Sequence, residues 1–217
     1  MTDFARTRVK ICGLTRVEDL EAAVSLGVDA VGLVFSPRSP RHLELDQARL
    51  LAARIPAFVT LVALFLDPPA DMVASVLDAV QPELLQFHGA ESPHFCTAFR
   101  RRYIKAIAMA QPQRLAAELA THPDASGFVL DSHAPGERGG TGEVFDWKTM
   151  PAGRPGLILA GGLDAANVGG AIRARAPFGV DVSSGVESAP GHKSAARMAD
   201  FIRAVREADQ ARNRMSS

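Results

Sequence analysis

The feature that most constrains the fold of this chain is a regular alternation between short apolar runs and segments with a helical repeat. Each apolar run is rich in Val, Ile, Leu or Phe and has the length of a buried strand. The segments between them carry apolar residues at three- and four-residue intervals, as in Val17, Leu20 and Val24. The pattern predicts eight strands: Arg8–Cys12, Ala30–Phe35, Phe58–Leu66, Leu84–His88, Ile104–Ala108, Gly127–Asp131, Leu157–Ala160 and Gly179–Ser183.

Eight strand-and-helix units without a break in composition predict a single (β/α)8 TIM barrel, of class α/β with a parallel sheet, over residues 1–217. A chain of this length can bury one such core. An open sheet that binds a dinucleotide is disfavoured, because no G-x-G-x-x-G follows the first strand. Barrel chemistry lies at the carboxyl ends of the strands, so functional residues are expected there.

Charge and cysteine content exclude several classes of protein. The 24 Lys and Arg residues balance 24 Asp and Glu residues, which removes the attraction needed to bind nucleic acid or an anionic membrane. The longest apolar stretch, residues 58–66, is too short to cross a bilayer, and residues 1–10 lack the apolar core of a signal peptide. We expect a cytoplasmic protein that acts on a small molecule and, because no spare apolar face stands out, a monomer.

The two cysteines, Cys12 and Cys96, lie far apart and have no metal-ligand spacing. Neither a disulfide framework nor a metal site is predicted. Cys96 falls in a predicted helix, where a free cysteine is usually a small buried hydrophobic residue.

Strand alternation predicts which polar side chains face the barrel interior. In the first strand, Val9 and Ile11 suit the helix layer, which turns Lys10 and Cys12 inward. The same alternation in strands four, six and eight adds five inward polar residues: Gln86, His88, Asp131, Asp181 and Ser183. Four of these residues end their strands and should converge on one mouth: Cys12, His88, Asp131 and Ser183.

An isolated cysteine would usually be a packing residue, but Cys12 has informative neighbours. The first and last strands of a closed barrel are adjacent, so inward Lys10 and inward Asp181 are predicted to pair. Because a nearby cation lowers the pKa of a thiol, we hypothesise that Lys10 biases Cys12 toward the thiolate.

Asp131 ends the sixth strand and is followed by a glycine-rich loop. A carboxylate that only orders a loop is the common alternative, but the inward position favours a catalytic role. Residues 135–142 include four glycines, among them Gly140 and Gly142, and this composition suits close approach to a ligand. We expect the loop to contact substrate and to move as a lid, although composition alone fits a tolerant surface loop equally well.

Two later turns are typical of a phosphate site. The seventh strand runs into Gly161 and Gly162, and the eighth runs into Ser183, Ser184 and Gly185. In barrels, the loops after these two strands commonly bind phosphate through backbone N–H groups and a helix N-terminus. The sequence therefore predicts a phosphorylated substrate.

The loop after the second strand offers Arg38 and Arg41, either of which presents a planar fork to a carboxylate. His88 fits a ligand contact and a satisfied polar lining residue equally well. The remaining histidines show no pairing pattern and are predicted at the surface: His42, His94, His122, His133 and His192.

Taken together, these segments resemble the phosphoribosylanthranilate isomerases of tryptophan biosynthesis. The resemblance spans nearly the whole chain in order: Val9–Thr15, Val31–Phe35, Ser36–Pro37, Arg41, Leu85–Gly89, Leu130–Asp131, Gly139–Gly142, Phe145–Trp147, Leu159–Leu163 and Val180–Glu187. The sequence departs from the family pattern at Pro40 and over residues 133–138, which affects only loop contacts.

The resemblance implies that N-(5-phosphoribosyl)anthranilate is rearranged to its 1-deoxyribulose isomer by an Amadori rearrangement without a cofactor. It also implies that Cys12 is the general base, Asp131 the general acid and Arg41 the residue that binds the anthranilate carboxylate. The acid must be protonated near neutral pH, which for an aspartate requires burial or a neighbouring anion.

Three rival functions fit the sequence less well. The related isomerase of histidine biosynthesis uses inward aspartates on strands one and five, where this chain has Cys12 and the apolar run Ala106–Met109. Indole-glycerol-phosphate synthase would require lysine and glutamate inside the mouth, which the strand ends do not supply. A non-catalytic barrel that binds a phosphosugar is disfavoured by the presence of both Cys12 and Asp131.

Overall fold

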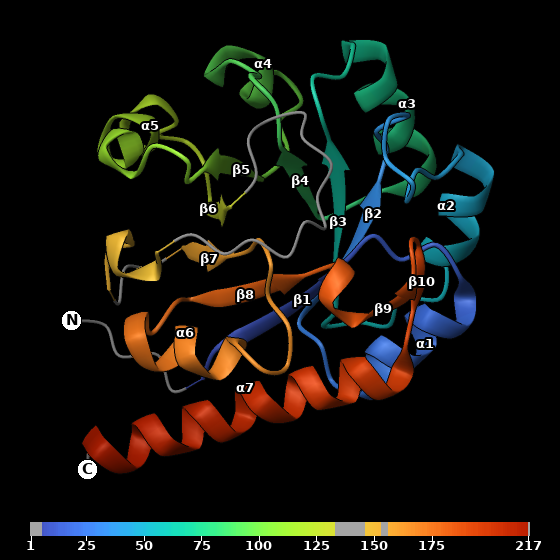
Figure 1. The fold of residues 1–217 in the computed structure, drawn as a ribbon. Coiled ribbons are helices and arrows are strands. Elements are labelled where there is room, and N and C mark those ends of the chain that lie inside the picture. Colours follow the sequence, from blue (N-terminus) through green and yellow to red (C-terminus); the bar gives the residue numbers. More distant parts are fainter. Residues whose placement is uncertain (1–5, 133–145, 153–155, 217) are drawn as a thin grey trace.

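The computed structural model describes residues 6–132, 146–152 and 156–216, and it has the predicted closed barrel (Figure 1). The parallel strands are β1 (Arg8–Cys12), β2 (Ala30–Val34), β3 (Thr60–Phe65), β4 (Leu84–Phe87), β5 (Tyr103–Ala108), β6 (Gly127–Asp131), β7 (Leu157–Leu159) and β8 (Gly179–Val182). Each strand pairs with the next, and β1 also pairs with β8, with Lys10 opposite Asp181. This pairing closes the barrel.

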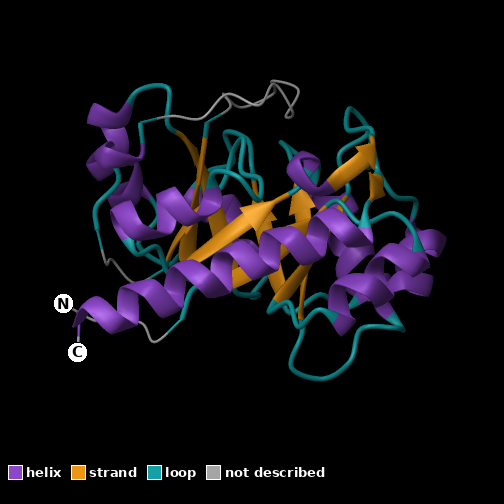
Figure 2. Cartoon of the chain, turned by 60° about the horizontal axis from the view of Figure 1, so that its bottom comes forward, coloured by secondary structure: helices purple, strands orange, loops and turns teal. Residues whose placement is uncertain are grey.

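Helices surround the strands (Figure 2). They are α1 (Val17–Ser25), α2 (Leu45–Ala52), α3 (Ala70–Val80), α4 (Pro93–Ala98), α5 (Leu115–Thr121), α6 (Val168–Arg175) and α7 (Ala195–Ser216). Three short 3-10 turns complete them: η1 (Pro112–Arg114), η2 (Trp147–Thr149) and η3 (Ser184–Val186). The long helix α7 packs against both α6 and α1, so the helical layer also joins the two ends of the fold.

The strand alternation predicted from the sequence is confirmed by the packing. Leu85 and Phe87 are fully buried between strands and helices, and they belong to the large apolar cluster of that layer. Val62, Ile104 and Val129 belong to a separate, small cluster. These three residues alternate with the outward set and fill the barrel interior. The polar residues that also point inward lie nearer the carboxyl ends of the strands, and they line the mouth of the barrel beyond this small cluster.

Two structural predictions are wrong. The third strand starts at Thr60 and not at Phe58, because Phe58 adopts a left-handed backbone with φ of 71° and its side chain is fully exposed. His122 is 6% exposed, because it packs edge-on against the Tyr103 ring and its Nδ1 lies 3.4 Å from the Tyr103 hydroxyl. Neither the turn before Thr60 nor the one after Thr121 leaves a periodic signal in the sequence.

A β-hairpin follows β8 that the strand pattern did not predict. It consists of β9 (Glu187–Ala189) and β10 (His192–Lys193), which pair antiparallel with an irregular register. The hairpin stands at the carboxyl end of the barrel, and its residues Glu187 to Pro190 help to line the mouth. The eighth strand is thus separated from its helix by a 3-10 turn and a hairpin.

Candidate active site

The carboxyl ends of the strands open into one cavity of about 1180 Å³. It is lined by predicted site residues from six strands and their loops: Cys12, Arg41, Gln86, His88, Asp131, Gly161, Gly162, Asp181, Ser183, Ser184 and Gly185. Lys10 lies behind Asp181, with which it is paired. Gly140, Gly142 and the proposed lid lie outside the described residues. Strand parity and the glycine turns thus converge on a single place.

Lys10 and Asp181 form the buried ion pair predicted from the sequence. The distance from Lys10 Nζ to Asp181 Oδ2 is 2.8 Å, and the side chains are 6% and 7% exposed. Burial is the largest single effect and works against the charge on Lys10, but the charge and hydrogen bond of Asp181, together with those of Cys12, outweigh it and raise the lysine pKa. Burial acts in the other direction on the carboxyl group, since it disfavours the charged form and raises the pKa of Asp181. Removing either partner would leave the other charge uncompensated in the barrel.

The Cys12 thiol, at the end of β1, is 6% exposed. Burial raises its pKa, and although the charge and hydrogen bond of Lys10 act in the opposite direction, the net shift is upward. The hypothesis that Lys10 biases Cys12 toward the thiolate therefore describes only one of two opposing effects. The thiolate, which is the form that could act as a base, is therefore disfavoured by burial and favoured by Lys10.

A polar chain crosses the mouth from β4 to β6. Gln86 Nε2 lies 3.3 Å from His88 Nδ1, and His88 Nε2 lies 3.5 Å from Asp131 Oδ2. Gln86 Oε1 and Asp181 Oδ1 are buried, and neither accepts a hydrogen bond from a described residue. Because buried acceptors need donors, these two oxygens favour a ligand that carries hydroxyl groups.

Glycines leave space for the proposed acid and base. A Cβ on Gly32, which pairs with Cys12 across β1 and β2, would lie 2.8 Å from Cys12 Sγ and 3.2 Å from Lys10 Nζ. A Cβ on Gly161 would lie 2.8 Å from Asp131 Oδ1, and Gly161 also has a φ of 79°. Gly32 was missed by sequence reasoning, since its partner across the sheet cannot be read from one strand alone.

The turns after β7 and β8 lie against each other, since a Cβ on Gly185 would collide with the carbonyl of Leu163. Ser184 and Gly185 begin η3, and the first amides of such a turn have no partner within it. Together with the backbone of Gly161 and Gly162, they line the same side of the cavity. This arrangement suits a phosphate bound by backbone N–H groups.

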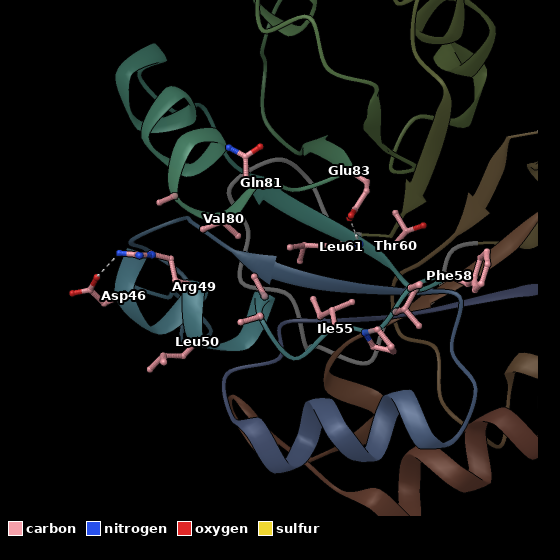
Figure 3. A pocket seen from close by; sticks show the side chains of 16 residues that line it. Asp46, Arg49, Leu50, Ile55, Phe58, Thr60, Leu61, Val80, Gln81 and Glu83 are labelled. Carbon is pink, nitrogen blue, oxygen red and sulfur yellow. Dashed lines mark hydrogen bonds and ion pairs between the residues drawn. The ribbon is translucent and has the colours of Figure 1, made fainter.

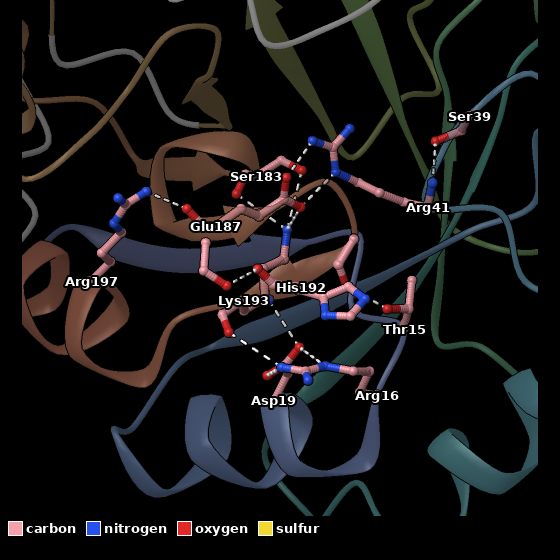
Figure 4. A network of polar contacts seen from close by, with 12 residues as sticks. Thr15, Arg16, Asp19, Ser39, Arg41, Ser183, Glu187, His192, Lys193 and Arg197 are labelled. Carbon is pink, nitrogen blue, oxygen red and sulfur yellow. Dashed lines mark hydrogen bonds and ion pairs between the residues drawn. The ribbon is translucent and has the colours of Figure 1, made fainter.

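Arg41 also lines the cavity and is held by Glu187 (Figure 4). Its Nε and Nη2 atoms donate to the two carboxylate oxygens at 2.7 and 2.6 Å. Lys193 Nζ lies 2.7 Å from the same carboxylate. Neither Glu187 nor Lys193 was predicted as a site residue, because both lie in the hairpin, where strand parity could not be applied. Arg38 also lines the cavity.

A second cavity, of about 1060 Å³, lies at the amino end of β3 (Figure 3). It is lined by α2, by the end of α3 and by the segment before β3, including Leu50, Ile55 and Phe58. Its ionisable residues include Asp46 and Arg49, which form an exposed pair at 3.9 Å. Because it contains none of the strand-end residues described above, the mouth at the carboxyl ends is the better candidate for chemistry.

Within the three described ranges, no group of three or more His, Cys, Asp or Glu residues is placed to hold a metal ion. No helix of the described chain is both long and apolar enough to cross a membrane.

Comparison with known proteins agrees with this geometry. The model of the family described as N-(5'phosphoribosyl)anthranilate (PRA) isomerase matches residues 9–204. The N-(5'-phosphoribosyl)anthranilate isomerase of Halorhodospira halophila is 51% identical over 205 residues, which cover 94% of this chain and 99% of the relative.

Solved structures point the same way. The phosphoribosyl anthranilate isomerase of Thermotoga maritima is 34% identical, with a TM-score of 0.82 over 93% of this chain and 99% of the relative. Another structure, of monomers generated from the same enzyme, gives that enzyme as dimeric. An isomerase in complex with reduced 1-(o-carboxyphenylamino)-1-deoxyribulose 5-phosphate is 33% identical, with a TM-score of 0.79 over 93% and 99% of the two chains. This chain therefore belongs to the N-(5'-phosphoribosyl)anthranilate isomerase family.

Proposed function

We propose that this chain isomerises N-(5-phosphoribosyl)anthranilate to 1-(2-carboxyphenylamino)-1-deoxyribulose 5-phosphate in tryptophan biosynthesis. The observation that carries the proposal is that Cys12 and Asp131, at the ends of β1 and β6, line one cavity with two glycine turns suited to phosphate. A phosphate site alone would fit many sugar-phosphate enzymes. The added thiol and carboxylate supply a base and an acid for proton transfer.

The reaction needs two proton transfers. Asp131 donates a proton to the furanose ring oxygen, and the ring opens to a Schiff base. Cys12, as the thiolate, then removes the C2′ proton, which gives an enolamine that tautomerises to the ketone. The proton that Cys12 gains is released and Asp131 takes one up, through solvent, so both groups return to their starting states. Asp131 and Asp181 repel each other electrostatically, which opposes both carrying a negative charge at once. The proton bookkeeping balances without a cofactor, because the product is an isomer of the substrate.

Binding would use the remaining lining groups. The turns at Gly161–Gly162 and Ser183–Gly185 bind the phosphate, and Arg41 binds the anthranilate carboxylate. The buried oxygens of Gln86 and Asp181 accept hydrogen bonds from sugar hydroxyls. Gly140 and Gly142, in the segment outside the described residues, are proposed to cover the bound substrate.

The purified protein should be mixed with freshly generated N-(5-phosphoribosyl)anthranilate and the loss of anthranilate-type fluorescence followed. Enzyme-dependent loss supports the proposal. Saturable binding without loss would favour a phosphosugar-binding barrel. Turnover only of the aminoimidazole carboxamide ribotide of histidine biosynthesis would favour the rival isomerase.

Both cysteines are free, which suits a reducing compartment, so a cytoplasmic location stays our prediction.

A further inference from the structure

The carboxylate of Glu187 lies between two cations at the rim of the cavity (Figure 4). It receives both Nε and Nη2 of Arg41, at 2.7 and 2.6 Å, and Lys193 Nζ at 2.7 Å. The Glu187 side chain is only 5% exposed and that of Arg41 12%. These are charge-assisted bonds in a site with little water, which makes them stronger and more directional than a surface pair.

The contact leaves Arg41 in one defined orientation. Glu187 occupies the Nε and Nη2 edge of the guanidinium, and no described residue accepts from Nη1. The aliphatic part of Arg41 passes over the Cα of Gly13, where an added Cβ would collide with Arg41 Cδ. A guanidinium fixed at its stem and along one edge can still offer its other edge to one carboxylate.

Lys193 connects this group to the turn after β8. Its side chain is completely buried, and Nζ lies 3.2 Å from the carbonyl oxygen of Ser183 as well as 2.7 Å from Glu187. Its backbone N–H donates to Asp19 at 2.9 Å, which fixes the hairpin to α1. The same lysine therefore contacts the carboxylate that orients Arg41 and the backbone of the proposed phosphate site.

The charges of the group suit an anionic ligand. Burial alone would raise the pKa of Glu187, but the hydrogen bonds from Arg41 and the charge of Lys193 outweigh it and lower the pKa. Glu187 is therefore ionised. Burial lowers the pKa of Lys193, while the charge and hydrogen bond of Glu187 oppose that shift. With Lys193 protonated, the group carries a net charge of about +1. Without Glu187, two cations would face each other across the rim, and Arg41 would lose the partner that defines its direction.

We propose that Glu187 and Lys193 are positioning residues that turn the free edge of Arg41 toward the substrate carboxylate and fix it relative to the phosphate turn at Ser183. The proposal rests on the proposed function, since it assumes a substrate with a carboxylate and a phosphate. Neither residue needs to touch the substrate. Their effect is to set the distance and angle between two sites that bind opposite ends of one molecule.

The test compares inhibitors that differ by one group. We suggest the reduced carboxyphenylamino-deoxyribulose phosphate and its phenylamino counterpart, which lacks the carboxylate. In Glu187→Gln, the inhibition constant of the first should rise about 10- to 100-fold, as expected for loss of an oriented charged contact, while that of the second changes less than about threefold. The KM of the substrate should rise together with the inhibition constant of the carboxylate-bearing inhibitor, while kcat changes less. Lys193→Met should act in the same direction.

Glu187→Asp, which keeps the charge, should recover part of the affinity, and the exposed pair His42–Glu44 supplies the control Glu44→Gln, which should behave as wild type. If Glu187→Gln does not fold, the inhibitor ratio of Glu187→Asp decides instead. Equal weakening of both inhibitors, or no weakening of either, overturns the positioning role. Absence of turnover in the wild type overturns the proposed function instead, and the two failures are therefore distinguishable.

Discussion

At the scale of single residues, the proposed acid and base have different surroundings. Cys12 is enclosed beside the Lys10–Asp181 pair, and burial raises its pKa. Asp131 lies 3.5 Å from His88 and is 15% exposed. The two groups thus lie in different environments within one cavity, which is the arrangement that a reaction with one protonation and one deprotonation requires.

Cys12→Ser and Asp131→Asn should each lower kcat by a factor of about 10³ or more, while KM changes less than about threefold. The reason is that each substitution removes a proton donor or acceptor and keeps the shape of the side chain. Steady-state fluorescence kinetics would measure both constants. A variant with wild-type kcat would remove that residue from the mechanism.

Gly32→Ala should lower kcat. Expressed as a free energy, this loss should exceed the loss in the free energy of unfolding. The new Cβ would lie 2.8 Å from Cys12 Sγ and must displace the thiol or Lys10. The matched control is Gly170→Ala in α6, where the nearest atom is 3.7 Å from the added Cβ and a helical glycine is replaced. The control should retain kcat and gain about 0.5–1 kcal/mol of stability. Equal kcat in the two variants would contradict the steric explanation.

Much of the mouth could be predicted from the sequence, because strand alternation is a local property. Cys12, Asp131 and Asp181 follow from the parity of their own strands. Glu187 could not be placed in this way, since its partner Arg41 is 146 residues away and lies in a loop. Gly32 could not be identified from the sequence either, because its role depends on Cys12 in the neighbouring strand β1.

At the scale of elements, β1 and β2 are joined at their amino ends by Asp29. Its carboxylate accepts from the backbone N–H of Val9 at 2.9 Å and from Arg6 Nη1 at 2.8 Å. Burial favours the neutral acid, but these hydrogen bonds outweigh it and lower the pKa of Asp29 below its ordinary 3.8. The joint lies at the end of the barrel opposite the proposed chemistry.

Because the folded-state pKa of Asp29 is depressed, its carboxylate stabilises the fold above its ordinary pKa and loses that effect as pH falls through the lowered value. Thermal unfolding of Asp29→Asn should therefore depend less on pH than that of wild type below about pH 4. Asp46→Asn, at an exposed site, should keep the wild-type dependence. Parallel curves for Asp29→Asn and wild type between pH 2 and pH 5 would contradict the prediction.

Elements were predictable where their repeat was long and regular, as in α3 and β6. The hairpin β9–β10 was not, because its two short strands have an irregular register and are mostly polar.

Lys105 shows the limit of alternation within a strand. It faces the helix layer and is buried there by Glu91, 3.3 Å away, which comes from the loop after β4. A polar residue on an apolar face is explained only by a partner elsewhere in the chain.

At the scale of the whole molecule, the ends of the chain are joined twice. The register of β1 against β8 closes the barrel, and α7 closes the helical layer. Thr7 donates to Asp209 from its backbone N–H at 2.7 Å and from Oγ1 at 2.8 Å, in a buried position. Ala208 and Asp209, in the second half of α7, are buried as a result.

Asp209→Ala should lower the free energy of unfolding by about 2–4 kcal/mol, because it leaves two buried donors on Thr7 without an acceptor. Asp200→Ala on the same helix removes only an exposed pair with Arg203 and should cost less than about 0.5 kcal/mol. Urea unfolding measured by circular dichroism would compare them. Equal midpoints for the two variants would show that the joint to α7 contributes little.

The expectation of a monomer stays a prediction, and a dimeric relative is known. Sedimentation at several concentrations would decide it: a single species of about 23.1 kDa supports the monomer, and a species of twice that mass contradicts it.

The pairing of Lys10 with Asp181 also bears on how the protein is made. These residues are 171 positions apart, and at the usual rate of translation the ribosome needs roughly 10–30 s to add that many amino acids. During most of that interval Cys12 has been synthesised, while β8, which closes the barrel beside β1, does not yet exist. A nascent chain would therefore expose the Cys12 thiol to oxidants and alkylating agents more fully than the finished barrel, in which it is 6% exposed.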